Sequence, residues 1–284
     1  MAQQTSNRVR RKVTASRRKP KDTAPVQTVK TMSTWQRYFL SVCIVVLFSL
    51  GFYRFFIRPY AYRWKPCYGM KGYGVCMPCN YDVHGIDISH YQGSINWRKL
   101  ATDKNLKFPI HFVFMKATEG GDLADETFEE NFEQAQKHGF VRGAYHYLTP
   151  KTDALKQADF FISTVKLHPG DLPPVLDVEV KGRKSVEELQ LSVKTWLQRV
   201  EQHFGVKPII YTSYKFKERY LNDSIFNTYP YWIAHYYVDS VRYAGKWHFW
   251  QHTDVGTVPG VAERVDLNVF NGTLQELTSL CIAP

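Results

Sequence analysis

Eight short apolar runs between residues 84 and 270 constrain the fold of this chain more than any other feature of its sequence. Each run is six to nine residues long and rich in β-branched and aromatic residues, as strands usually are. The runs cover residues 84–89, 110–118, 142–148, 173–180, 208–213, 231–236, 247–253 and 265–270. Eight strands are the number that closes a (β/α) barrel, so we predict an α/β barrel.

Helical patterns separate these runs in the first half of the barrel. Residues 126–138 and 154–165 carry apolar side chains at helical spacing. Ser185 and Glu188 form a capping-box pattern at the start of a third helix, which should end at Gly205. The helical signal weakens after residue 213. We therefore predict an irregular, TIM-barrel-like architecture with fewer or shorter helices in its second half.

An uncharged apolar stretch near the N-terminus predicts a membrane span. Residues 38–53 contain no charged side chain, and the apolar stretch extends to residue 57. About 20 residues cross a bilayer, so residues 38–57 are predicted to form a single transmembrane signal anchor. A cleaved signal peptide is the alternative, but its n-region would be unusually long and no convincing small-residue cleavage site follows.

The positive charge of the chain is concentrated before this span. Residues 1–37 hold ten basic residues and one acidic residue, which is +9 of the net charge of +11. This segment has no hydrophobic periodicity and is predicted to be a disordered tail. Only five basic residues closely follow the span, so the N-terminus is predicted to be cytoplasmic. A nucleic-acid-binding arm is the alternative, but a basic segment directly before a span favours a topology and lipid signal.

Four cysteines lie beyond the span, at Cys67, Cys76, Cys79 and Cys281. They allow three pairings, between which the sequence does not decide, and one bridge could tie the end of the chain to residues 58–80. We assign residues 58–80 to a cysteine-containing stalk. "CMPC" resembles a thioredoxin-type redox motif, but no redox fold surrounds it. A zinc site is not favoured either, because the sequence has no second CxxC motif to complete the set of ligands.

Carboxylates gather at the ends of the predicted strands. In "PPVLDVEV", strand periodicity places Val175, Asp177 and Glu179 on the face that points into the barrel. Leu176, Val178 and Val180 lie on the other face and are predicted to pack against helices. "GIDIS" adds Asp87 and "VDLNVF" adds Asp266. Crowded carboxylates raise at least one pKa, which suits glycoside hydrolysis. Taken alone, a D-x-E pair more often caps a loop or pairs with a basic residue.

No metal or other cofactor is expected at this site. None of the ten histidines forms an HxH or HExxH pattern, which are the spacings typical of clustered metal ligands.

The ordered motifs of the chain resemble those of family 25 glycoside hydrolases, the Chalaropsis-type lysozymes or N-acetylmuramidases. The resemblance covers about residues 82–273 and consists of "HGIDISHYQGSINW", "FVFMKATEG", "GAYHYL", "PPVLDVEV", "PIIYTS", "YWIAHY", "FWQHT" and "VDLNVF". It implies a flattened, irregular barrel over residues 81–284. It also implies cleavage of the β-1,4 bond between N-acetylmuramic acid and N-acetylglucosamine in peptidoglycan.

The resemblance also implies catalytic roles. Glu179 matches the general acid, Asp177 its partner, and Asp87 and Asp266 the acids of the first and last strands. We expect Asp177 to orient the 2-acetamido group of the substrate as nucleophile, with retention of configuration; inversion through an activated water is the alternative.

Six further residues are candidates for the glycan groove, because aromatic rings and polar tips suit sugars. They are Lys116, Tyr145, Tyr147, Tyr211, Trp232 and Gln251. Core packing is the alternative for each aromatic residue. The predicted partners are peptidoglycan strands and a bacterial inner membrane, with the catalytic domain in the periplasm. A non-catalytic glycan-binding or scaffold protein on the same barrel is the competing function, and the four acids favour the enzyme.

Overall fold

The computed structural model describes residues 32–58, 67, 69–103 and 107–283, which divide into two units after residue 60. Most of the predicted basic tail, residues 1–31, lies outside the described residues, as do residues 59–66 of the predicted stalk. Each unit is described by itself.

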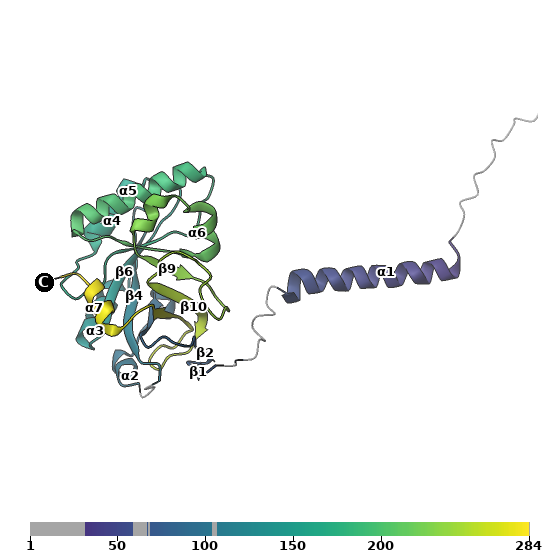
Figure 1. Ribbon diagram of the computed structural model, residues 1–284, viewed down its shortest axis with the longest axis horizontal. Helices are drawn as coiled ribbons and strands as arrows, with labels where there is room; N and C mark the ends of the chain where they lie inside the picture. Colours follow the sequence, from purple (N-terminus) through teal and green to yellow (C-terminus); the bar gives the residue numbers. More distant parts are fainter. Residues whose placement is uncertain (1–31, 59–66, 68, 104–106, 284) are drawn as a thin grey trace, which may run out of the picture. The chain divides into compact units, whose positions relative to one another are not determined.

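The described residues of the first unit form one apolar helix, α1 (Thr34–Phe52), which continues as a π-helical turn over Tyr53–Ile57 (Figure 1). Ser33 begins the helix with a capping box, accepting from the backbone N–H of Gln36 while donating its own N–H to the Gln36 side chain. Within Thr34–Ile57, an 18-residue window has a mean hydropathy of 2.2, and no residue of the stretch is buried. A helix that is apolar on all sides suits a membrane span better than a soluble surface.

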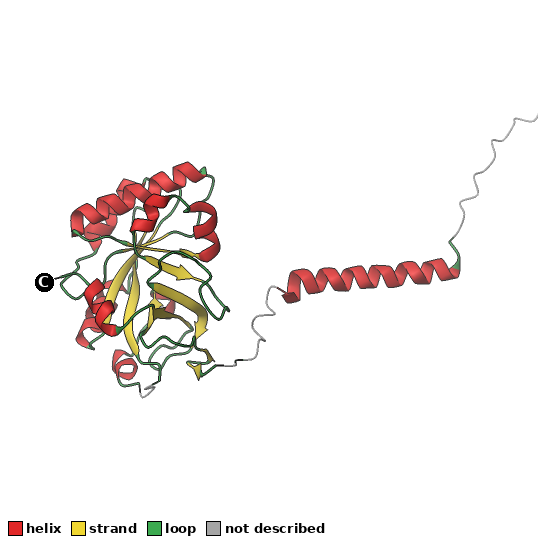
Figure 2. Cartoon of the chain, viewed as in Figure 1, coloured by secondary structure: helices red, strands yellow, loops and turns green. Residues whose placement is uncertain are grey.

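The second unit contains a closed barrel of eight strands (Figure 2). The strands are β3 (His84–Ile88), β4 (Ile110–Glu119), β6 (Val141–Tyr147), β7 (Val175–Asp177), β8 (Ile209–Ser213), β9 (Tyr231–Ala234), β10 (Phe249–Gly256) and β11 (Val265–Phe270). They pair in the order β3-β11-β10-β9-β8-β7-β6-β4, and pairing of β3 with β4 closes the ring. A short strand, β5 (Leu123–Ala124), pairs with the end of β4. The predicted fold class is confirmed.

Strand β11 runs antiparallel to both of its neighbours. Only a loop joins β10 to β11, and a parallel return would need a crossover connection of a dozen or more residues. The beginning of β11 therefore lies at the same mouth as the ends of the parallel strands, and Asp266 stands directly opposite Asp87 in the register.

The helices follow the predicted distribution. They are α2 (Trp97–Ala101), α3 (Phe128–Lys137), α4 (Ala154–Thr164), α5 (Val186–Phe204), α6 (Tyr214–Tyr220) and α7 (Leu274–Leu280). α5 is the longest of them, with the expected capping box at Ser185 and Glu188. It ends at Gly205, whose φ of 71° is in the left-handed region.

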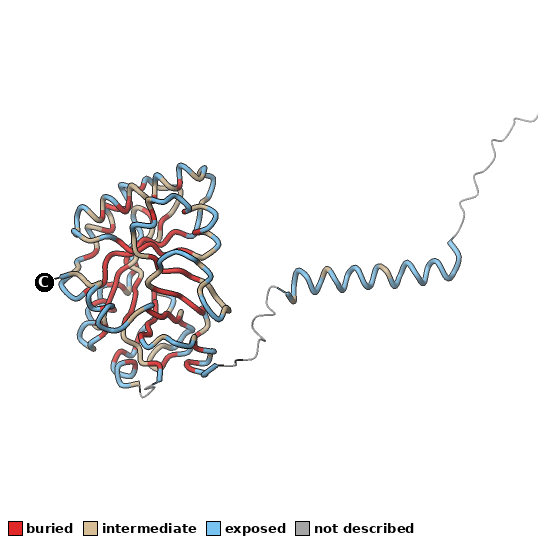
Figure 3. The backbone as a smooth tube through the Cα atoms, viewed as in Figure 1, coloured by how far each residue is buried: buried red, intermediate tan, exposed pale blue. Residues whose placement is uncertain are grey.

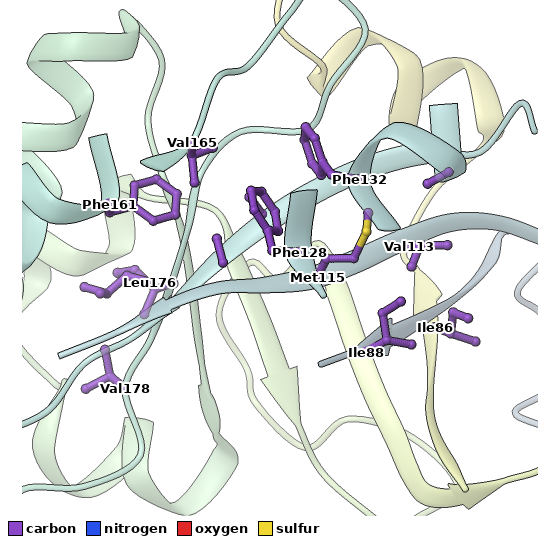
Figure 4. Close-up of a cluster of buried hydrophobic side chains, with 14 of the residues drawn as sticks. Ile86, Ile88, Val113, Met115, Phe128, Phe132, Phe161, Val165, Leu176 and Val178 are labelled. Carbon is purple, nitrogen blue, oxygen red and sulfur yellow. The ribbon is translucent and has the colours of Figure 1, made fainter. Parts of the chain in front are cut away.

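Buried residues follow the strands at the centre of the second unit (Figure 3). Alternation along the strands divides this core into two layers. On β4, Phe112 and Phe114 belong to the cluster inside the barrel, whereas Val113 and Met115 belong to the cluster beneath the helices. Figure 4 shows part of that outer layer, with Phe161 of α4 and Leu176 of β7 among its labelled side chains. The inner layer forms the floor beneath the mouth of the barrel.

The structure corrects the prediction for residues 173–180. Strand pairing stops at Asp177, so Glu179 lies in the segment that follows β7. Val178 is buried, and its N–H donates to Tyr211 O (2.9 Å), which preserves the alternation for one more residue. Val180 is 41% exposed, so the prediction that it packs against helices is wrong. The chain has by then left the sheet for the loop before α5.

A small hairpin from the predicted stalk packs on the barrel. It consists of β1 (Lys71–Gly72) and β2 (Val75–Cys76), and a disulfide joins Cys67 to Cys76. Tyr73 and Met77 are buried in the outer core cluster, and Thr257 N–H donates to Tyr73 O (2.8 Å). Cys79 and Cys281 are free thiols, so in this structure no bridge joins the described end of the chain to this region.

A chain shortened to begin at residue 81 should unfold at a lower temperature than one that begins at residue 61. The shorter chain loses the buried Tyr73 and Met77, and removing one large buried side chain costs about 2–5 kcal/mol. We expect Tm to fall by roughly 4 °C or more, measured by circular dichroism. A Cys67→Ser/Cys76→Ser variant of the longer chain is the control for the disulfide. Equal Tm values for the two lengths would show that the hairpin is dispensable.

Candidate active site

An open cleft of about 480 Å³ lies at the mouth of the barrel. All ten predicted site residues line it, although they come from all eight strands of the barrel and from the segment after β7. They are Asp87, Lys116, Tyr145, Tyr147, Asp177, Glu179, Tyr211, Trp232, Gln251 and Asp266.

Asp87 is a buried carboxylate held by two amides. Its Oδ2 accepts from Gln251 Nε2 (2.8 Å) and from Asn268 Nδ2 (2.7 Å). Burial raises the pKa of Asp87 to about 6, although both amide hydrogen bonds oppose the shift, and the Glu179 charge adds to it. The amides fix the orientation of this carboxylate, which therefore presents one defined edge to the cleft.

Asp266 completes a paired acid with Asp87. Burial raises the pKa of Asp266 to about 9, and the neighbouring Asp87 carboxylate is the next cause. The raised pKa of Asp266 favours its protonated form, which donates a hydrogen bond to Asp87. The pair holds one proton between two strands that meet directly in the sheet.

Replacing Asp266 by Asn should weaken the pH dependence of stability. Between an unfolded pKa near 4 and the folded value of about 9, the folded state retains a proton that the unfolded state has lost. The wild-type free energy of unfolding therefore falls as pH rises through this window, and Asn removes that contribution. Urea unfolding measures the free energy of unfolding at pH 5 and at pH 8. Its fall between these pH values should be larger in the wild type than in Asp266→Asn by about 1 kcal/mol or more. Asp239→Asn, an exposed change, is the control; an unchanged decline in Asp266→Asn would contradict the assignment.

Asp177 and Glu179 face the same cleft from one side of the mouth. Asp177 is 7% exposed, and its buried Oδ1 has no hydrogen-bond partner among the described residues. Its pKa is raised well above the usual range by burial and by the charges of Glu179 and Asp87. Partial enclosure raises the pKa of Glu179, and the Tyr211 hydroxyl offsets part of that shift. Glu179 is the exposed member, open to an incoming ligand.

Lys116 supplies the positive charge of the cleft. Its Nζ lies 2.6 Å from Glu119 Oε2 and 5.5 Å from the ring centroid of Tyr147. The ammonium lowers the pKa of Asp177, opposing the surrounding carboxylates. Lys116, which was predicted for the glycan groove, therefore lies among the carboxylates of the cleft, with Glu119 as its direct partner.

Aromatic residues form the floor and the walls. Trp232 is 2% exposed, stacks on Phe114 at 4.4 Å between ring centroids, and donates from Nε1 to Asn268 Oδ1 (2.8 Å). Tyr211 donates its hydroxyl to Gln251 Oε1 (2.7 Å). Trp232 is thus both floor and core, so the core-packing alternative holds for it. Tyr145 and Tyr147 line the cleft from β6, and the ring centroid of Tyr145 lies 6.5 Å from that of Trp232.

Several residues that line or support the cleft were missed by sequence reasoning. They are Ile88, Ser89, Tyr91, Gln92, Glu119, Tyr236 and Asn268. Most lie just beyond the ends of strands, where strand periodicity no longer indicates direction. Two carried a usable signal: Glu119 follows Lys116 by three residues, and Asn268 shares a strand face with Asp266.

Comparison with known sequences identifies a family. The sequence profile of Glycosyl hydrolases family 25 matches residues 86–261. The uncharacterized protein YegX of Escherichia coli (strain K12) is 43% identical over 223 residues, which are 78% of this chain and 80% of that protein. Lysozyme M1 of Streptomyces globisporus is 32% identical over 213 residues, or 70% of this chain and 71% of that protein.

Solved structures share the barrel. A bacterial lysozyme from Streptomyces coelicolor superposes with a TM-score of 0.64 at 32% identity, covering 71% of this chain and 98% of the other. A family 25 glycosyl hydrolase from Bacillus anthracis superposes with a TM-score of 0.65 at 30% identity, covering 72% and 95%. Sequence and fold agree with the resemblance seen in the strand motifs, and the chain belongs to glycosyl hydrolase family 25.

Proposed function

We propose that this protein is a membrane-anchored N-acetylmuramidase that cleaves the β-1,4 bond between N-acetylmuramic acid and N-acetylglucosamine in peptidoglycan. The observation that carries the proposal is the convergence of four carboxyl groups with raised pKa values on one open cleft, those of Asp87, Asp177, Glu179 and Asp266. Such a cluster keeps a protonated acid beside ionised partners, as glycoside hydrolysis requires. Relatives named lysozyme support the substrate class.

Glu179 is proposed as the general acid. Its raised pKa favours the protonated form, and its exposed position allows contact with the oxygen of a bound glycosidic link. As the bond between C1 and the leaving oxygen breaks, Glu179 gives its proton to that oxygen. The resulting carboxylate then takes a proton from the water that attacks C1.

Asp177 is proposed to orient the 2-acetamido group of the substrate. Its Oδ1 is buried without a partner among the described residues, so it can accept the acetamido N–H. The acetamido oxygen then attacks C1 as the leaving oxygen departs, and water opens the cyclic intermediate with overall retention. This step needs the ionised form of Asp177, and Lys116 lowers the pKa of Asp177 against the burial and the neighbouring carboxylates that raise it. Inversion, with water activated by an aspartate, is the alternative.

Helix α1 is proposed as an uncleaved anchor, with the N-terminus in the cytoplasm and the barrel in the periplasm. Thr34–Ile57 is long and apolar enough to cross a bilayer, and it has no buried face. The charge excess of residues 1–37 supports this orientation. Protease added to spheroplasts should digest the barrel while sparing the N-terminal tail. A barrel released in soluble form, without α1, would instead indicate a cleaved signal.

Digestion of purified peptidoglycan tests the activity. The full chain in detergent should release reducing ends, and mass spectrometry of the fragments should find N-acetylmuramic acid at those ends. Reducing-end N-acetylglucosamine would indicate a glucosaminidase. Binding to peptidoglycan without release of reducing ends would favour the non-catalytic alternative.

A further inference from the structure

Tyr91 is unusual among the aromatic residues of the second unit. It is 73% exposed, and it is the one Phe, Tyr or Trp of the described residues beyond residue 60 that is classed as exposed. It also lines the cleft, in the short 3₁₀ turn His90–Gln92 that follows β3. An exposed apolar residue needs no explanation by itself. An exposed aromatic residue that is held at the rim of a catalytic cleft, however, is placed where a bound ligand can contact it.

The turn that carries Tyr91 is held from two sides. His90 Nδ1 lies 3.0 Å from Asp125 Oδ2, and the His90 backbone N–H donates to the same oxygen (2.9 Å). The Asp125 side chain is fully buried, so this support is fixed. On the other side, Gln92 Nε2 donates to Arg264 O (3.0 Å), in the loop before β11. The turn therefore has little freedom to collapse onto the barrel.

The Tyr91 ring itself rests on the imidazole of His90. Their centroids are 4.2 Å apart, with an angle of 35° between the planes. One face of the Tyr91 ring is thus covered, and its large exposed area lies on the remainder of the ring. Such a ring is already ordered before a ligand arrives, which reduces the entropy lost on binding.

We propose that Tyr91, supported by His90, is a stacking platform for a hexosamine ring of the glycan strand, outside the two sugars that flank the cleaved bond. This inference rests on the proposed function. Sugar rings present an apolar C–H face that packs on aromatic rings. Tyr91 follows β3, whereas Glu179 follows β7, and the strand order leaves β4 and β6 between them on one side and four strands on the other. A strand that contacts both residues must cross the mouth of the barrel.

Binding of defined glycans to the full chain in detergent tests this platform. All binding variants carry Glu179→Gln, which prevents turnover. Two peptidoglycan glycans without stem peptides serve as probes: a disaccharide and an octasaccharide. We expect Tyr91→Ala to weaken octasaccharide binding by about 3- to 10-fold and to reduce the preference for the longer probe. Tyr91→Phe should retain that preference. His90→Ala should reduce it in part, because Tyr91 then loses its support.

Matched variants and outcomes separate the platform from other effects. Leu191→Ala, at a residue on α5 that is 64% exposed, should bind both probes like the background. An undiminished length preference in Tyr91→Ala, or equal losses in Tyr91→Phe and Tyr91→Ala, overturns the stacking role. Absence of glycan binding by the background overturns it as well. If the wild type hydrolyses peptidoglycan but glycan binding does not depend on Tyr91, the platform alone is refuted. If binding depends on Tyr91 but the wild type does not hydrolyse peptidoglycan, the proposed activity alone is refuted.

Discussion

Replacing Glu179 by Gln should lower the rate of peptidoglycan cleavage by about 10²–10⁴-fold, which is the usual contribution of a positioned general acid. Gln keeps the shape of the side chain but carries no proton that can pass to the leaving oxygen. Glu179 is exposed and lies beyond the end of β7, so the change should leave the barrel folded. Release of reducing ends from purified peptidoglycan measures the rate, and thermal unfolding checks the fold.

The control for this variant is Glu129→Gln, an exposed change on the first turn of α3. It should retain the wild-type rate. The wild-type rate should also fall as pH rises through the raised pKa of Glu179, because the acid must begin protonated. A loss of less than about tenfold in Glu179→Gln would transfer the role of acid to another group of the cleft.

Replacing Asp177 by Asn should lower kcat by about 10²–10³-fold with a smaller change in KM. Asn can still hydrogen-bond, but it does not supply the negative charge that we expect to stabilise the attacking acetamido group, an effect of the size seen for preorganised electrostatic groups. Loss of an interaction made mainly in the transition state lowers kcat more than it raises KM. Steady-state rates on soluble glycan strands measure both constants.

The stereochemistry of the wild-type reaction provides the second test of the role of Asp177. Retention through the acetamido group gives the β anomer first, which proton NMR detects before mutarotation. Asp239→Asn is the matched control for the kinetic loss, because it makes the same exchange at an exposed position. A first-formed α anomer would rule out substrate assistance and favour a water activated by an aspartate.

The barrel and most of its site could be predicted because strand periodicity reports direction. Residues that alternate on a strand point to opposite layers, and the split of β4 between the two core clusters follows that rule. The same rule brought Asp87 and Asp177 to the cleft. Ser185 and Gly205 gave the bounds of α5, because capping chemistry is local in sequence.

What the sequence did not reveal depends on contacts between distant segments. The antiparallel direction of β11 depends on the short loop before it and on pairing with β3, and no local pattern of residues states this. The hairpin around Tyr73 looks like linker because its few apolar residues are buried only by the barrel. Nothing in "HYQ" distinguishes Tyr91 from other tyrosines of the sequence. Its position at the rim depends on the hydrogen bond from His90 to Asp125, 35 residues away from His90.

The position of β11 also determines when the cleft can exist during folding. Asp87 receives a hydrogen bond from Asn268, 181 residues later, and its paired acid lies on the same last strand. Contacts over such separations carry a large loop-closure cost and favour slow folding. A nascent chain that has not yet docked its last strand holds three of the four acids but lacks Asp266 and the amide of Asn268 at the mouth of the barrel. Hydrolytic competence is therefore a property of the completed ring, and a barrel still open during synthesis has no assembled site.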